Sequence, residues 1–388
     1  MRLINKLEDV RKAVGKCIRC TICTYSGWPD NYTICPMYSY DKCFTYSGGG
    51  FMYLAKNLID KKLIFDSKVS DLLYTCSGCL ACDEICEIIP YSEPYVSHFD
   101  IVRLMRREAV KRGLIKDKKL KRIQAQIKSY EEAVLTIKDN VLGIPEKIFD
   151  KNAKRLLFVD WQCLTSQQKT YKSVLNLLEK IGEPIGGISD RGLSFPELYD
   201  LGFWSELEEY LTTKFDIKLL KGKELIFINP HLEEFIKSRL PEIISGYDNI
   251  KTRHISEVLL EALKEEKLRG KKGLKRVKVS FHDPCYLGRG LKIYEPPREV
   301  LSLIDSIELI EMDRNKKDSF CCGARAGDNY FQDFSKKTAH ERLIEFKMTG
   351  ADLLITACPY CKGIFRKITF DKRNIVKDIT EIIEERIE

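Results

Sequence analysis

Short apolar runs alternate with amphipathic stretches through the C-terminal two thirds of the chain. The runs have the length of single strands and cover residues 156–160, 224–228, 277–281, 307–310 and 352–355. Stretches with apolar residues at helical spacing lie between them, at 172–181, near 297–304 and at 334–348. Short apolar strands that alternate with helices are typical of parallel sheets covered on both faces. The pattern therefore predicts an α/β fold here.

The N-terminal region shows helical spacing only. Residues 51–59 and 98–109 carry apolar side chains at helical intervals, and no strand-like alternation appears. We therefore expect an all-helical domain over residues 1–110, in which His98 is a surface or packing residue. Residues 111–154 are charged and helical in pattern, with a break at Gly143-Ile144-Pro145, and we interpret them as a helical linker.

The α/β region looks like two diverged copies, residues 155–270 and 271–388. The stretch 157–163 parallels 280–285, and 254–259 parallels 378–383. In the second pair, Ser256 and Thr380 are placed as helix N-caps, because a short hydroxyl side chain can accept a hydrogen bond from the first helical turn.

Composition describes a soluble globular protein long enough for two or three domains, with 44% hydrophobic and 31% charged residues among 388. No apolar run approaches the ~18 residues of a membrane span, and the first residues lack an apolar signal region. We therefore expect a cytoplasmic protein. The net charge of +8 comes from basic residues interleaved with acidic ones, which argues against nucleic-acid binding. Peripheral docking to a membrane stays open.

Fifteen cysteines in a reducing compartment indicate metal or redox sites rather than disulfides. Two N-terminal runs resemble the bacterial-ferredoxin pattern, in which three close cysteines hold one cubane and the distant fourth binds the other cluster. The resemblance implies two [4Fe–4S] clusters with crossed ligands. One set is Cys17, Cys20, Cys23 and Cys86, and the other is Cys76, Cys79, Cys82 and Cys35. Cys43 competes with Cys35, which we prefer because Pro36 follows it. Zinc ribbons fit poorly, since they use pairs rather than triplets of cysteines.

Five further cysteines form one C-terminal pattern: Cys285, Cys321-Cys322-Gly323 and Cys358-Pro359-Tyr360-Cys361. Adjacent side chains point apart, so a loop made permissive by Gly323 is needed to turn both thiols toward one polymetallic body. Soft thiolates select iron–sulfur clusters or zinc. Cys285 and Cys358 follow expected strands, at the edge where α/β sheets bind ligands.

These residues, with the stretch 282–289, resemble the cysteine-rich CCG domain of the B and D subunits of heterodisulfide reductase. The resemblance implies a non-cubane [4Fe–4S] cluster, or zinc as in some relatives. It also implies an α + α/β fold: a helical ferredoxin domain followed by two Rossmann-like halves. His282 is either a core residue that supports the metal ligands or a proton donor to substrate sulfur.

The first of the two halves lacks most of the motif. Residues 191–193 stand near the expected cysteine pair, and 228–231 stand near the expected Cys-Pro-x-Cys. Cys163 remains, either as a buried small hydrophobe or as a thiol near the cleft between the halves.

The resemblance implies that electrons pass through the cubanes to the non-cubane site, which reduces or forms a disulfide. The alternative is a non-catalytic electron-transfer subunit of a larger complex. A zinc-stabilised scaffold would leave the eight ferredoxin-type cysteines without a role. Implied partners are other redox subunits, such as a flavoprotein or membrane cytochrome, and a disulfide, thiol or small sulfur-carrier protein.

Overall fold

The computed structural model describes residues 6–27, 32–89, 91, 96–115, 118, 142–190, 194–215, 217–324, 332–369 and 374–388. It divides into two compact units. Unit 1 comprises Met1–Tyr130, Glu197–Leu207 and Lys317–Ala339, and unit 2 comprises Glu131–Pro196, Glu208–Lys316 and His340–Glu388. Most of the expected linker, and residues 191–193, lie outside the described residues.

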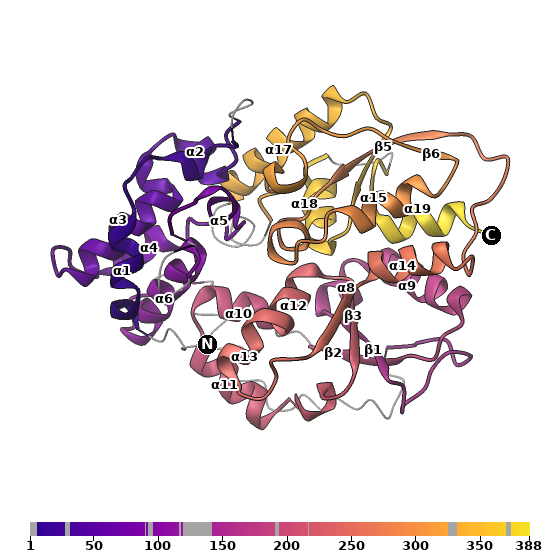
Figure 1. Cartoon of the computed structure of the whole chain (residues 1–388), viewed down its shortest axis with the longest axis horizontal. Helices are drawn as coiled ribbons and strands as arrows, with labels where there is room; N and C mark the ends of the chain where they lie inside the picture. The colour runs from indigo at the N-terminus through magenta and orange to yellow at the C-terminus, as the bar shows by residue number, and fades with distance from the viewer. Residues whose placement is uncertain are drawn as a thin grey trace. The chain divides into compact units, whose positions relative to one another are not determined.

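The described N-terminal part of unit 1 is helical (Figure 1). Its helices and short helical turns (η) are η1 (Leu7–Val10), α1 (Arg11–Lys16), η2 (Ile22–Thr24), α2 (Pro36–Asp41), η3 (Phe44–Tyr46), α3 (Gly48–Ile59), α4 (Ser67–Leu73), α5 (Ala81–Ile85) and α6 (His98–Lys111). Tyr25 and Thr33 form an isolated antiparallel bridge, and the described residues of this unit contain no longer strand.

Helix α6 anchors the cysteine-bearing loops of unit 1. It begins with a capping box, in which Ser97 accepts from the Asp100 N–H and the Asp100 carboxylate accepts from the Ser97 N–H. Its Arg106 is fully buried and donates hydrogen bonds to the carbonyl oxygens of Leu73 and Cys76, at 2.9 and 2.7 Å. Because a buried guanidinium needs such acceptors, these bonds fix the start of the second cysteine run against the helix.

Unit 2 contains two parallel four-stranded sheets of the same order. The first runs β2-β1-β3-β4 and the second β6-β5-β7-β8. The strands are β1 (Arg155–Val159), β2 (Gly186–Ser189), β3 (Glu224–Phe227), β4 (Lys251–His254), β5 (Val277–His282), β6 (Ile307–Leu309), β7 (Leu353–Thr356) and β8 (Val376–Asp378). The expectation of helices combined with parallel α/β sheets is thus confirmed, and β2, β4 and β8 are additional.

Helices connect these strands. They are α8 (Trp161–Thr165), α9 (Gln168–Ile181), α10 (Phe195–Leu201), α11 (Trp204–Thr213), η4 (Ile217–Leu220), α12 (Pro230–Glu234), η5 (Phe235–Arg239), α13 (Leu240–Ile243), α14 (Ile255–Lys264), η6 (Tyr286–Gly290), α15 (Glu295–Ser302), η7 (Lys316–Asp318), α17 (Gln332–Met348), α18 (Pro359–Thr369) and α19 (Ile379–Arg386). Helices α10, α11 and α17 and the turn η7 each contribute residues to both units.

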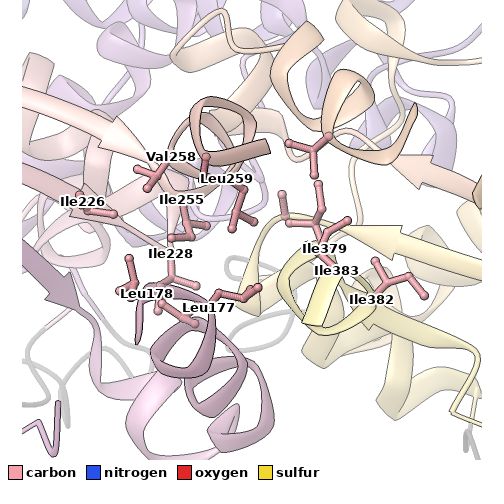
Figure 2. Close-up of a cluster of buried hydrophobic side chains, with 14 of the residues drawn as sticks. Leu177, Leu178, Ile226, Ile228, Ile255, Val258, Leu259, Ile379, Ile382 and Ile383 are labelled. Atoms are coloured by element: carbon pink, nitrogen blue, oxygen red, sulfur yellow. The ribbon is translucent and has the colours of Figure 1, made fainter. Parts of the chain in front are cut away.

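The two sheets of unit 2 share one hydrophobic core. Helix α9 packs against α19, and α14 packs against α15. Figure 2 shows Leu177 of α9 and Leu259 of α14 on one side of this core, with Ile379 and Ile383 of α19 on the other. Burial of each such side chain contributes about 1.5–3 kcal/mol, so the sheets are held together by apolar contact.

The predicted caps of α14 and α19 are wrong by two residues. The N-caps are His254 and Asp378, whose side chains accept from the N–H groups of Ser256 and Thr380. The hydroxyl residues therefore lie inside the first turn. The shift is the same in both copies, because in each the last residue of a strand already carries a side chain that can accept that bond.

Candidate metal centres

Unit 1 contains two cavities, each lined by four cysteines. Cavity A is lined by Cys35, Cys76, Cys79 and Cys82. Cavity B is lined by Cys17, Cys20, Cys23 and Cys86. In each cavity three thiols come from one run and the fourth comes from the other part of the sequence. Four thiols in a largely apolar hollow are a donor set that fits an iron–sulfur cluster. Cys43 is exposed and lines neither cavity.

The two cysteine runs have the same backbone turn. Arg19 and Thr21, on either side of Cys20, have φ of 59° and 64°. Gly78 and Leu80, on either side of Cys79, have φ of 65° and 62°. Left-handed conformations cost free energy at Arg19, Thr21 and Leu80, which are not glycine, and the same turn around both middle cysteines indicates a shared role. Gly78 is also required sterically, since a Cβ there would lie 2.4 Å from the Phe99 ring.

His98 is a functional candidate that the sequence did not reveal. It is 2% exposed and lines both cavities, so of the two expectations the surface residue is wrong and the packing residue is confirmed. Its Nδ1 lies 2.8 Å from Asp83 Oδ1, and like Cys86 it lines cavity B. The sequence feature that could have identified His98 is its position as the first residue of an amphipathic helix just after a cysteine run.

Electrostatics distinguish Cys86 from the other thiols. Burial raises the pKa of Cys23 to about 12 and that of Cys76 to about 11, because a low-dielectric environment disfavours the thiolate. Burial also acts to raise the pKa of Cys86, but the hydrogen bond from His98 and the N–H groups of Ile89 and Ile88 outweigh it and lower that pKa. For His98, burial acts to lower the pKa, and its bonds to Asp83 and Cys86 raise it to about 9.

Unit 2 gathers part of the C-terminal motif at the carboxyl ends of β5 and β7. His282 ends β5 and Cys285 follows three residues later, while Cys358 and Cys361 lie at the start of α18. A ring nitrogen of His282 and the Cys361 sulfur lie within 4.8 Å of each other. The His282 Nδ1 accepts a hydrogen bond of 3.2 Å from Nε of Arg342, which is fully buried. In a neutral imidazole the proton is then carried on Nε2.

A buried ion-pair network holds the loop after β5. The Arg298 guanidinium binds both carboxylate oxygens of Asp283, at 2.7 and 2.9 Å, and also binds Glu311. Bidentate pairing fixes Asp283 in orientation as well as position. The network therefore holds the residues between His282 and Cys285 in place.

Cys321 and Cys322 lie in unit 1 and are buried. Gly323 has φ of 76° and donates its N–H to the Cys321 sulfur at 3.4 Å. A Cβ at Gly323 would lie 2.8 Å from the Cβ of Thr338, so only glycine fits at this position. That all five C-terminal cysteines meet at one site is a proposal.

The β1–β4 sheet carries Cys163 as a fully buried thiol. The Cys163 N–H donates to Asp160 Oδ1 at 2.8 Å, within the first turn of α8. Asn229 precedes Pro230 of α12, as Cys358 precedes Pro359 of α18. A capping amide thus occupies the place that a cysteine holds in the second sheet.

Residues 279–366 match the model of the cysteine-rich domain named CCG. Over 110 residues the chain is 42% identical to the D subunit of a dihydromethanophenazine:CoB–CoM heterodisulfide reductase from Methanosarcina acetivorans, covering 28% of this chain and 27% of that protein. It is 25% identical over 339 residues to EtfAB:quinone oxidoreductase of Syntrophomonas wolfei, covering 79% of this chain and 44% of that protein. The chain thus spans less than half of either relative.

A crystal structure of a hypothetical protein from Helicobacter pylori has a similar fold, with a TM-score of 0.56 and 14% identity over 88% of this chain and 68% of that one. Together the sequence matches confirm the resemblance to the D subunit of heterodisulfide reductase and related iron–sulfur proteins. They also support an iron–sulfur oxidoreductase type of function. Among the described residues, no helix is long and apolar enough to cross a bilayer.

Proposed function

We propose that this chain passes electrons through [4Fe–4S] clusters in cavities A and B to a third metal site, which reduces or forms a disulfide. The observation that carries the proposal is the pair of four-cysteine cavities, with crossed contributions from the two runs. Crossed ligation ties the two runs together and keeps two one-electron carriers adjacent. Two such carriers suit a substrate that takes up two electrons.

The third site is proposed to use Cys285, Cys321, Cys322, Cys358 and Cys361. The CCG match from 279 to 366 contains all five, which supports their convergence. When bound there, a non-cubane [4Fe–4S] cluster would supply one-electron chemistry at sulfur. Zinc is the alternative occupant, but a tetrahedral zinc site needs only four ligands.

The overall change is cleavage of one S–S bond: the disulfide takes two electrons and two protons and gives two thiols. His282 is proposed to deliver a proton, because Arg342 occupies its Nδ1 and leaves the proton on Nε2. Burial of His282 and Cys361 excludes bulk water from this proton. The same groups serve thiol oxidation in the opposite direction.

A second candidate is a non-catalytic electron-transfer subunit. The similarity to EtfAB:quinone oxidoreductase over 79% of the chain favours it, as does the missing cysteine motif of the β1–β4 sheet. In either case the proposed partners are other redox subunits, such as a flavoprotein or membrane cytochrome. The catalytic hypothesis adds a disulfide, thiol or sulfur-carrier protein.

Metal analysis and EPR of the anaerobically prepared protein test the proposal. We expect about twelve irons, from two cubanes and one four-iron site, and an EPR signal that changes when thiol is added to the oxidised protein. About eight irons with one zinc would reject disulfide chemistry and favour the electron-transfer hypothesis. Absence of iron would reject both.

A further inference from the structure

We propose that the loop 269–276 of unit 2 is a docking surface for a bilayer that carries anionic phospholipids. The loop lies between α14 and β5 and reads Arg269-Gly270-Lys271-Lys272-Gly273-Leu274-Lys275-Arg276. It contains five basic residues and no acidic one, whereas basic and acidic residues are interleaved over most of the chain. This inference goes beyond the proposed function and does not depend on it.

The loop is held at both ends by hydrogen bonds beside the end of α19. Gly270 and Ile387 form an antiparallel bridge, and the Lys271 N–H donates to the Arg386 carbonyl oxygen at 2.8 Å. At the other end, the Arg386 guanidinium donates to the Lys275 carbonyl oxygen at 3.0 Å. Because the backbone of the loop accepts and donates these bonds, the basic side chains of the loop are not needed to hold its conformation.

The tip of the loop, residues 271–276, is open to solvent. Gly273 has φ of 76°, and a Cβ there would have no heavy atom of the described residues within 4 Å beyond its chain neighbours. Leu274 is 40% exposed, although a leucine gains free energy by leaving water. Three basic side chains beside it are exposed and form no ion pair with another described residue: Lys272, Lys275 and Arg276. The tip thus presents an apolar side chain among cations.

Acidic residues near the loop leave most of this charge in place. Glu266 pairs with Arg269 at 2.8 Å, and Glu385 pairs with the lysine of β8 at 2.5 Å. Asp305 and Glu388 are also exposed in the segments that adjoin the loop. The four basic residues of the tip outnumber these two carboxylates, so the surface attracts an anionic partner.

Two features favour a bilayer over a nucleic acid as that partner. The loop contains no aromatic side chain that could stack on bases. Its leucine can enter the boundary between headgroups and acyl chains while the basic side chains stay among the lipid phosphates. Clusters of about four to eight basic residues bind anionic headgroups in this way. A single such patch gives reversible, peripheral binding.

Vesicle co-sedimentation of the anaerobically prepared full chain tests this. We expect binding to vesicles of phosphatidylcholine mixed with phosphatidylglycerol, and little binding to phosphatidylcholine alone. Binding should weaken as salt is raised, because salt screens exposed charges. The triple variant Lys272→Gln/Lys275→Gln/Arg276→Gln should lower the partition coefficient about 100-fold, since each basic residue contributes about fivefold.

The matched control is Lys172→Gln/Lys218→Gln/Lys251→Gln. It removes the same charge from dispersed, exposed positions of unit 2 and should leave the partition coefficient nearly unchanged. A second variant, Leu274→Trp, keeps every charge of the loop. Its added tryptophan emission should shift to shorter wavelength when vesicles with phosphatidylglycerol are added, because the indole leaves water.

Equal binding to vesicles with and without phosphatidylglycerol overturns the inference, as does unchanged binding of the triple variant or an unshifted emission in Leu274→Trp. Duplex DNA is measured with the same variants. If the triple variant loses DNA binding but keeps vesicle binding, the loop is a nucleic-acid site instead. A protein that binds these vesicles through the loop but shows no disulfide turnover keeps this inference and rejects only the catalytic function.

Discussion

The β1–β4 half of unit 2, with α9, α12 and α14, and the β5–β8 half, with α15, α18 and α19, have the same strand order. Only the second has cysteines of the motif directly after its central strands. Each half buries its central strands, and both contribute to one core. Because the half without the motif keeps the same fold, apolar packing and helix caps maintain this architecture without metal ligands.

The helix that follows the third strand of each half shows how equivalent positions diverge. In the β5–β8 half, the fourth residue of α18 is Lys362, which is buried and paired with Glu381 of α19. In the β1–β4 half, the fourth residue of α12 is Glu233, and the third residue of α14 is Glu257. An attractive pair in one half thus corresponds to two carboxylates in the other.

The halves meet through the ion pair itself. Lys362 also donates to the hydroxyl of Thr170 on α9, at 2.8 Å, and that hydroxyl donates to Glu381, at 2.8 Å. A side chain of the β1–β4 half therefore completes the coordination of a buried charge beside the Cys358–Cys361 helix. The half without the motif therefore contributes a contact that supports the half that carries it.

The largest effect is expected when cysteines of the C-terminal motif are compared with Cys163. Cys358→Ser, Cys321→Ser and Cys322→Ser should each abolish disulfide turnover and remove the third metal site, while both cubanes stay reducible. Cys163→Ser should be nearly silent, because that thiol is a buried packing group. Iron content, EPR and turnover provide the measurement. Loss of turnover in Cys163→Ser would place the active centre at the thiol of the β1–β4 half.

A second test breaks the charge pair. Lys362→Met should lower the free energy of unfolding by about 3–5 kcal/mol, because it leaves the buried Glu381 with only Lys169, a half-exposed cation 3.9 Å from its Oε2. The double variant Lys362→Met/Glu381→Leu should recover much of that loss. Lys367→Met, on an exposed residue of the same helix, is the control in chemical denaturation. A cost equal to that of the control would show that the pair does not bind the halves together.

The corresponding carboxylates of the β1–β4 half predict a pH dependence. Burial, reinforced by Glu257, raises the pKa of Glu233 to about 8. A carboxyl group whose pKa is raised on folding stabilises fully below its unfolded pKa and loses that contribution as pH rises through 8. Glu233→Gln should therefore reduce the fall in stability between pH 5 and 8 by about 3–4 kcal/mol. Denaturation midpoints across this range measure it, and Glu208→Gln, at an exposed site, should leave the profile unchanged.

The smallest effect is expected from substitutions at the helix N-caps. His254→Ala and Asp378→Ala should each destabilise by about 1 kcal/mol, because each removes an acceptor for the first turn of its helix. Ser256→Ala should cost less, since its hydroxyl is not the cap. Thermal or chemical unfolding measures the difference. A larger loss of stability in Ser256→Ala than in His254→Ala would support Ser256 as the N-cap, as expected from the sequence.

Much of the α/β part was predictable because its central strands are short apolar runs, a pattern that few other secondary structures produce. β1, β3, β5 and β7 are of this kind. β2 begins Gly186-Gly187 and β4 reads Lys251-Thr252-Arg253-His254, so neither has the composition of a strand. These edge strands form because a neighbouring strand offers hydrogen-bonding groups, which is a tertiary effect.

The candidate metal centres were likewise predictable only in part. The ferredoxin resemblance implied the two sets of cysteines that line cavities A and B, and three cysteines of each set lie close in sequence. His98 was missed because its partner Asp83 is fifteen residues away and no local pattern joins them. Ion pairs between helices, such as Lys362 with Glu381, cannot be predicted from the sequence either, because they depend on how the helices pack.

Cys20 is exposed, whereas Cys23 and Cys86 are buried and Cys17 is partly covered. A cluster in cavity B would therefore have one corner that dioxygen and chelators reach before any other. If cavity B holds the proposed cluster, oxidative damage in air should begin at this corner. In the proposed electron path, this open corner, next to the exposed side chains of Ile18 and Ile22, would give an electron the shortest entry.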